Sequence, residues 1–146
     1  MKAYADSSFI VALYLQEQNS GAVAAFMQQY GMALPFTAWH RLEVRNAMRL
    51  AVFHRAIESF QAKAQLGQLE IDLREKTLVV HTPIDWVNIL RKAEHLGAAR
   101  NESLGCRSSD LFHVASALES GADQFLTFDD RQRKMAKAAG LTVDFE

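Results

Sequence analysis

Short apolar segments typical of β-strands alternate along this chain with longer segments of helical periodicity, and this alternation restricts the possible folds most. The strand-like segments are 2–5, 32–36, 77–81, 124–128 and 141–145, and the helical segments span about 9–15, 21–30, 38–52, 55–73, 83–97, 109–120 and 131–139. Strands separated by helices form βαβ crossovers and a mainly parallel sheet covered on both faces. We therefore expect an α/β fold.

Capping residues and glycines set the expected ends of the helices. The expected N-caps are Ser7 or Ser8, Thr37 and Ser108, and the expected stops include Gly31 and Gly97. The segment 98–106 that follows Gly97 is then expected to be a loop.

Length and composition indicate one domain, residues 1–146, because 49% hydrophobic content is enough for a core and no linker divides the chain. The longest apolar run, "FIVALYL", is too short to span a bilayer, and no secretory signal is recognised. Cys106 is the only cysteine, which favours a cytoplasmic protein without an internal disulfide. A net charge of −1 argues against a strongly basic nucleic-acid binder, although acids gathered in a metal site would leave a positive remainder.

Two acids directly follow predicted strands. Asp6 comes after the segment 2–5, and Asp129 comes after 124–128. Ligands of open parallel sheets bind beyond the carboxyl ends of the strands, so both acids lie where a site is expected. A second interpretation stays open for Asp129, because Asp129–Asp130 is also a turn that would cap the next helix.

Two further acids lie on predicted helices. Asp110 falls in a first turn, where the helix dipole alone favours an acid by about 0.3–1 kcal/mol. Glu43 and Asn46 fall inside an apolar stripe on their helix, and Glu43 is either a site residue or an acid at the edge of the stripe that pairs with a basic side chain. The stripe consists of Trp39, Leu42, Ala47 and Leu50.

If the four acids converge, they need compensation, because removing each charge from water costs several kcal/mol. Either some of them are protonated or a cation joins them, and an all-carboxylate site favours Mg²⁺ or Mn²⁺ over zinc. The five histidines are scattered, and His113, on the helix of Asp110, is more typical of a packed residue than of a catalytic one. The chain contains no glycine-rich phosphate loop.

Three segments together resemble the PIN domain and, within that superfamily, the VapC ribonuclease toxins of type II toxin–antitoxin pairs. They are "YADSSFIVALYLQE", "TAWHRLEVRNAM" and "RSSDLFHVASALESGADQFLTFDDRQRKMAKAAGLTV". In order and spacing they account for nearly the whole chain, whereas residues 53–106 match only as a generic helix–strand–helix. The resemblance implies a three-layer α/β/α sandwich with a mainly parallel central sheet.

The resemblance also implies roles for particular residues. The carboxylates that bind metal and carry catalysis would be Asp6, Glu43, Asp110 and Asp129. The residues that orient ligands or substrate would be Ser7, Ser8, Asn46, Thr127 and Asp130. Thr127 stands two positions before Asp129, which makes Asp129 a better match to the last family acid than Asp130.

The activity implied by the resemblance is Mg²⁺- or Mn²⁺-dependent hydrolysis of RNA phosphodiester bonds by a metal-activated water, within a VapBC-type pair. The implied partners are RNA, a small cognate antitoxin and a second copy of the chain, and no membrane is implied. Residues that would meet RNA, or else form solvated helix faces, are Arg41, Arg45, Arg49, Arg131, Arg133 and Lys134. Residues that would form a dimer surface, or else core, are Tyr14, Phe26 and Met27.

Three alternatives to a toxin stay open at this point. A stand-alone PIN nuclease in RNA processing would use the same chemistry without an antitoxin. A haloacid-dehalogenase-like phosphatase also has an acid after its first strand but needs a second Asp two residues later, where this chain has Ser8. A non-catalytic PIN-like binding module would normally have lost one or more of the acids.

Overall fold

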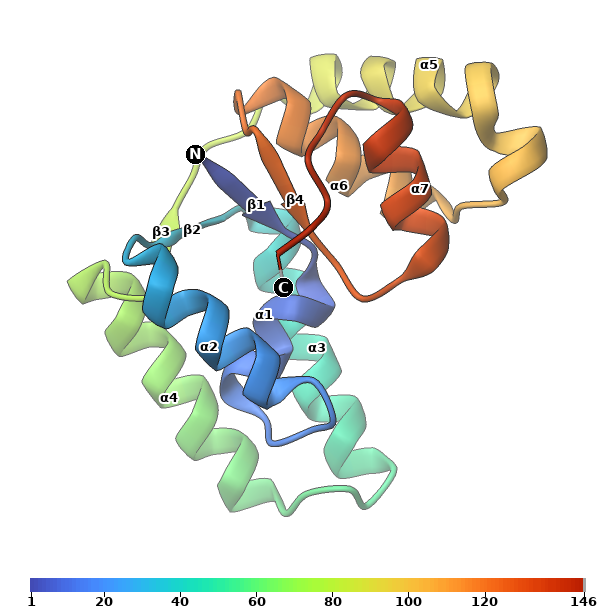
Figure 1. Cartoon of the computed structure of the whole chain (residues 1–146). Helices are drawn as coiled ribbons and strands as arrows, with labels where there is room; N and C mark the ends of the chain where they lie inside the picture. The colour runs from blue at the N-terminus through green and yellow to red at the C-terminus, as the bar shows by residue number, and fades with distance from the viewer. Residues whose placement is uncertain (146) are drawn as a thin grey trace. The chain divides into compact units, whose positions relative to one another are not determined.

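The computed structural model describes residues 1–145, which form two compact units (Figure 1). The terminal unit comprises Met1–Asp6 and Ile84–Phe145, and the middle unit comprises Ser7–Pro83. The strands are β1 (Ala3–Ala5), β2 (Leu34–Phe36), β3 (Val79–His81) and β4 (Gln124–Leu126). The helices are α1 (Ser7–Tyr14), α2 (Ser20–Tyr30), α3 (Ala38–Phe53), α4 (Ser59–Glu75), α5 (Trp86–Leu104), α6 (Ser108–Glu119) and α7 (Asp130–Ala138).

In the terminal unit, β1 pairs with β4 in parallel, with Ala5 opposite Leu126. Helix α6 packs against β1, α7 packs against β4, and α5 packs against both α6 and α7 (Figure 1). Tyr4 and Phe125 are fully buried between these elements and stack with ring centroids 5.9 Å apart. The expected last strand, 141–145, contributes a single parallel bridge from Thr142 to β4.

In the middle unit, β2 pairs with β3 in parallel, with Leu34 opposite Val79. Helix α1 packs against α2, α3 and α4, and α4 packs against β3. Two predicted helix ends are confirmed: Gly31 follows α2 with a φ of +68°, and Thr37 caps α3 by accepting a hydrogen bond from the His40 amide at 3.2 Å. None of the helices in residues 1–145 is long and apolar enough to cross a membrane.

A buried carboxylate that the sequence did not suggest ties α4 to α1. Asp72 is 6% exposed and accepts hydrogen bonds from the Tyr14 hydroxyl at 2.7 Å and from the side chains of Gln68 and Thr77 at 3.0 Å each. Burial, followed by the bond to Asp72 and its charge, raises the pKa of Tyr14 above its ordinary value. Tyr14 is 6% exposed and Met27 is 7% exposed, so both are core residues, which is one of the two interpretations left open by the sequence.

The prediction that Gly97 ends a helix is wrong, and so is the predicted loop over 98–106. Helix α5 continues through Gly97 to Leu104, and Gly105, with a φ of +69°, follows its last residue. A Cβ atom at position 97 would lie 3.3 Å from Leu111 Cδ1 of α6. Gly97 thus permits close packing of two helices rather than a turn.

The predicted apolar stripe on α3 has the wrong phase. Leu42 is 60% exposed, whereas the buried face of α3 consists of His40, Val44 and Met48. The reason is His40, a polar residue that is fully buried because its ring stacks on Phe36 and its Nδ1 accepts a hydrogen bond from the Thr37 amide.

Two predicted N-caps are also wrong by one position. Ser7 is the first residue of α1, and Ser108 is the first residue of α6. Arg107 occupies the N-cap of α6, where its amide donates to the Asp110 carboxylate at 3.1 Å. Asp110, at the third helical position, therefore supplies the capping hydrogen bond at the start of α6, where a serine was expected.

Candidate active site

Asp6 and Thr127 lie side by side where β1 and β4 end. The register pairs Ala5 with Leu126, so the next residue of each strand falls opposite its neighbour. The Thr127 hydroxyl donates to Asp6 Oδ2 at 2.6 Å and accepts a hydrogen bond from the Asp129 amide at 3.0 Å. Asp6 is 5% exposed and Thr127 is 1% exposed, so this contact holds a buried carboxylate in place.

Asp129 caps helix α7, as one interpretation of the sequence proposed. Its Oδ1 accepts a hydrogen bond from the Gln132 amide at 2.9 Å. Its Oδ2 accepts no hydrogen bond from any residue in 1–145. Capping uses only one of the two oxygens, so the second oxygen of Asp129 keeps its capacity to bind a cation.

Asp110 lies in the first turn of α6 and is 8% exposed. Its Oδ2 accepts from the Arg107 amide at 3.1 Å and from Arg107 Nε at 3.4 Å. Among the described residues no donor reaches its Oδ1. The Arg107 side chain is 77% exposed, and because such exposed ion pairs contribute only about 0–1 kcal/mol, Arg107 compensates the buried charge weakly.

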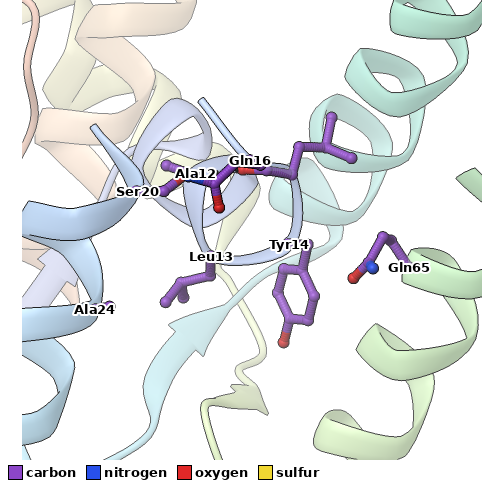
Figure 2. A pocket seen from close by; sticks show the side chains of 8 residues that line it. Ala12, Leu13, Tyr14, Gln16, Ser20, Ala24 and Gln65 are labelled. Atoms are coloured by element: carbon purple, nitrogen blue, oxygen red, sulfur yellow. Dashed lines mark hydrogen bonds between the residues drawn. The ribbon is translucent and has the colours of Figure 1, made fainter. Parts of the chain in front are cut away.

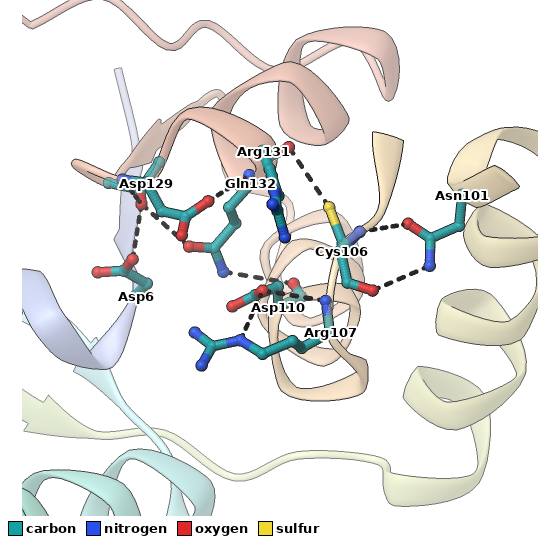
Figure 3. Close-up of polar contacts among 9 residues, drawn as sticks. Asp6, Asn101, Cys106, Arg107, Asp110, Asp129, Arg131 and Gln132 are labelled. Carbon is teal, nitrogen blue, oxygen red and sulfur yellow. Dashed lines mark hydrogen bonds and ion pairs between the residues drawn. The ribbon is translucent and has the colours of Figure 1, made fainter. Parts of the chain in front are cut away.

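Gln132 connects Asp129 with the main chain of Asp110 and lies beside Thr127, and the sequence analysis missed it (Figure 3). Its amide donates to Asp129, its Oε1 lies 3.0 Å from Thr127 Oγ1, and its Nε2 donates to the main-chain oxygen of Asp110 at 3.4 Å. Because the Thr127 hydroxyl has one proton, the shorter distance assigns that proton to Asp6. The D-x-x-Q spacing of Asp129 and Gln132 is that of a capping box and was the available signal.

An open cavity of about 420 Å³ adjoins this network. Its lining consists only of charged residues, which are Arg107, Asp110, Asp129, Asp130 and Arg131. Cys106 lies beside it, 8% exposed, with its Sγ donating to the Arg131 carbonyl at 3.4 Å. Burial and then the charges of Asp110 and Asp129 raise the pKa of the Cys106 thiol, while Arg131 opposes this. Cys106 therefore stays a neutral thiol at neutral pH.

The other predicted site residues belong to the middle unit. The Ser7 hydroxyl donates to Glu43 Oε1 at 2.8 Å, and Ser7 follows Asp6 directly in the chain. Ser8 and Asn46 are exposed. On α3, Arg41 and Arg45 both pair with Glu70 of α4, at 2.8 and 3.0 Å.

His113 packs in the interior of the terminal unit. It is 3% exposed, and its Nδ1 lies 2.9 Å from the Tyr4 hydroxyl. This confirms the interpretation of His113 as a packed residue.

The donor chemistry of the terminal unit suits a hard divalent cation. Asp110 and Asp129 each have one carboxylate oxygen with no hydrogen bond from residues 1–145, and carboxylate oxygens are the ligands that hard divalent cations prefer. Within the same described range, no group of three or more His, Cys, Asp or Glu side chains is already arranged to hold a metal ion. The carboxylates are thus of the type that binds such an ion, and a bound ion would have to bring them together.

A second cavity, of about 310 Å³, lies in the middle unit (Figure 2). It is lined by Ala12, Leu13, Tyr14, Leu15, Gln16, Ser20, Ala24 and Gln65. None of these side chains is charged, so the cavity has no carboxylate that would hold a cation.

The parallel strand pairs, joined by helices, define an α/β protein. Its acids follow β1 and β4 and lie at the start of α6, so carboxylates gather near the carboxyl ends of β1 and β4. The family model of the PIN domain matches residues 3–138, and the chain belongs to this family. The predicted α/β fold class of a PIN domain is therefore confirmed. No curated protein matches the chain.

Two solved structures support the same fold. VapC20 of Mycobacterium tuberculosis, described as a toxin that cleaves the sarcin-ricin loop, is similar with a TM-score of 0.69 and 16% identity, over 99% of this chain and 100% of its own. FitAcB of Neisseria gonorrhoeae is similar with a TM-score of 0.65 and 16% identity, over 97% of this chain and 95% of its own. At such identities the likeness concerns the fold.

Proposed function

We propose that this chain is a metal-dependent endoribonuclease and the toxin of a VapBC-type toxin–antitoxin pair. The observation that carries the proposal is the network in which Thr127 and Gln132 connect Asp6, Asp129 and Asp110 beside a charged cavity. The Asp110 carboxylate is buried and pairs with a largely exposed Arg107 side chain, and a buried acid with so weak a counter-charge is costly in a purely structural role. The PIN family and the likeness to VapC20 supply the substrate class, RNA.

The proposed metal ligands are Asp6, Asp110 and Asp129, with Glu43 added on the strength of its motif in the sequence. If these residues hold Mg²⁺ or Mn²⁺, the ion would supply a bound water of lowered pKa and positive charge beside the phosphate. Thr127 positions Asp6 through its short hydrogen bond, and Ser7 positions Glu43 in the same way. Asp110 and Asp129 use one oxygen each for helix capping, which fixes the direction of the other oxygen.

We propose a small cognate antitoxin as the protein partner. It would block the charged cavity of the terminal unit by placing a basic side chain beside Asp110, Asp129 and Asp130. Homodimerisation and a cytoplasmic location also belong to this proposal. Arg131, which lines the cavity, is the proposed RNA contact in the terminal unit.

The chemistry of the cleaved ends tests the proposed mechanism. Attack by an activated water needs no 2′-hydroxyl nucleophile, so we expect products with 5′-phosphate and 3′-hydroxyl ends. Ligation of the downstream fragment with an RNA ligase that requires a 5′-phosphate, together with mass spectrometry of the upstream fragment, measures both ends. Fragments that end in 2′,3′-cyclic phosphate would exclude the mechanism.

A further inference from the structure

The exposed side of α3 has three arginines spaced one helical turn apart. Arg41, Arg45 and Arg49 follow one another at intervals of four residues, which is a rise of about 6 Å per step. A groove of about 330 Å³ runs along this face, lined by Ala38, Arg41, Leu42, Arg45, Asn46 and Arg49. This rise along the helix is close to the spacing of consecutive phosphates along an extended nucleic-acid strand.

One carboxylate of the neighbouring helix neutralises part of this row. Glu70 Oε1 lies 2.8 Å from Arg41 Nη2 and 3.0 Å from Arg45 Nη1. The Arg41 and Glu70 side chains are 41% and 44% exposed, so water screens the pair and it contributes little stability. An anion that binds the same two guanidinium groups can therefore replace Glu70 at low cost.

The rest of the groove offers groups with no partner of their own. Within residues 1–145, no carboxylate pairs with Arg49 and no hydrogen bond engages the Asn46 side chain. Leu42 is 60% exposed at the same groove. The groove thus combines guanidinium groups, an amide and an apolar side chain. In single-stranded RNA these groups suit phosphates, base edges and base faces, respectively.

We propose that the α3 groove binds the phosphodiester backbone of the RNA substrate and that Glu70 is an internal competitor that weakens this binding. The inference rests on the proposed ribonuclease function and adds an RNA-binding surface to it. In the absence of RNA, Glu70 occupies Arg41 and Arg45. RNA phosphates displace it, so the strength of the Glu70 pairs sets the affinity for RNA.

RNA binding in EDTA tests this inference separately from cleavage. Anisotropy of a labelled single-stranded RNA is measured at several salt concentrations for the wild type, Glu70→Gln and Arg45→Gln. The matched control is Glu75→Gln, which removes the same charge from an exposed site on the same helix, five residues away and on a different face. Cleavage by each variant with Mg²⁺ is recorded alongside.

We expect Glu70→Gln to bind RNA about two- to fivefold more tightly and Glu75→Gln to bind like the wild type. Arg45→Gln should bind more weakly, with a salt slope shallower by about 0.7 for the lost phosphate contact. Unchanged affinity in Glu70→Gln, while the wild type still cleaves RNA, overturns the inference and leaves the proposed function standing. Equal displacement of RNA by polyglutamate of matched charge also overturns it. Absence of both binding and cleavage in every protein overturns the proposed function as well.

Discussion

Asp110→Asn is expected to lower the rate of metal-dependent RNA cleavage by at least about 100-fold without unfolding the protein. The Asp110 carboxylate is 8% exposed, and only its Oδ2 is used within the described chain, for the cap of α6. Asparagine keeps an oxygen that can accept from the Arg107 amide but removes the negative charge that would hold a cation. Losing several kcal/mol of charge stabilisation at the phosphate corresponds to two or more factors of ten in rate.

The control for this variant is Glu119→Gln on the same helix. Glu119 lies at the other end of α6, where it pairs with Lys92 at 3.0 Å on the surface. It loses the same charge and should keep wild-type activity, because exposed pairs contribute little. Circular dichroism and urea unfolding of both variants establish that they fold. A folded Asp110→Asn protein that cleaves RNA at the wild-type rate would remove Asp110 from the catalytic site.

Thr127→Val is expected to lower the rate of cleavage by about 10- to 100-fold, the range typical of residues that orient a metal ligand. Valine has nearly the shape of threonine but can neither donate to Asp6 nor accept from the Asp129 amide, contacts that measure 2.6 and 3.0 Å. We also expect a loss of about 1–3 kcal/mol in the free energy of unfolding, because buried polar groups lose their partner.

Two measurements distinguish a positioning role from a purely structural one. If Thr127 positions Asp6 for a cation, Thr127→Val should require a higher Mg²⁺ concentration for half-maximal cleavage than the wild type. Thr127→Ser keeps the hydroxyl and should restore most of the activity and the normal Mg²⁺ requirement. A Thr127→Val protein with reduced stability but an unchanged Mg²⁺ requirement and rate would show that the bond serves folding alone.

The acids at the strand ends could be predicted from sequence because the signal is local. An apolar segment followed directly by an acid identifies both Asp6 and Asp129, although β4 ends at Leu126 and not at the predicted residue 128. The parallel register brings Asp6 beside Thr127. The parallel direction of the strand pairs follows from the alternation of strands and helices, whereas the choice of partners, β1 with β4 and β2 with β3, does not. These inferences need only the order of elements along the chain.

Features that depend on packing between distant segments could not be predicted. Gly97 looks like a helix stop, but its role is set by Leu111 on another helix. The phase of α3 depends on burial of His40 against Phe36, which no hydrophobicity pattern assigns to a histidine. The pairing of Arg41 and Arg45 with Glu70 likewise requires knowing which face of α4 meets α3.

Gln132 falls between these two cases. Its bond to the Asp129 carboxylate follows from a local capping pattern that the sequence contains. Its contacts with Thr127 and with the main chain of Asp110 depend on how α7 packs in the terminal unit. The sequence therefore predicts the contact of Gln132 with Asp129 but not its contacts with Thr127 and Asp110.

The most direct test of the central claim is cleavage of total cellular RNA by the purified wild-type protein, stripped of metal and of any bound partner. The account predicts no cleavage in EDTA and cleavage on addition of Mg²⁺ or Mn²⁺, reversed by excess chelator. Cleavage that proceeds equally in EDTA, or a folded protein that leaves RNA intact with both metals, would contradict the assignment of Asp6, Asp110 and Asp129 to a metal-dependent ribonuclease site.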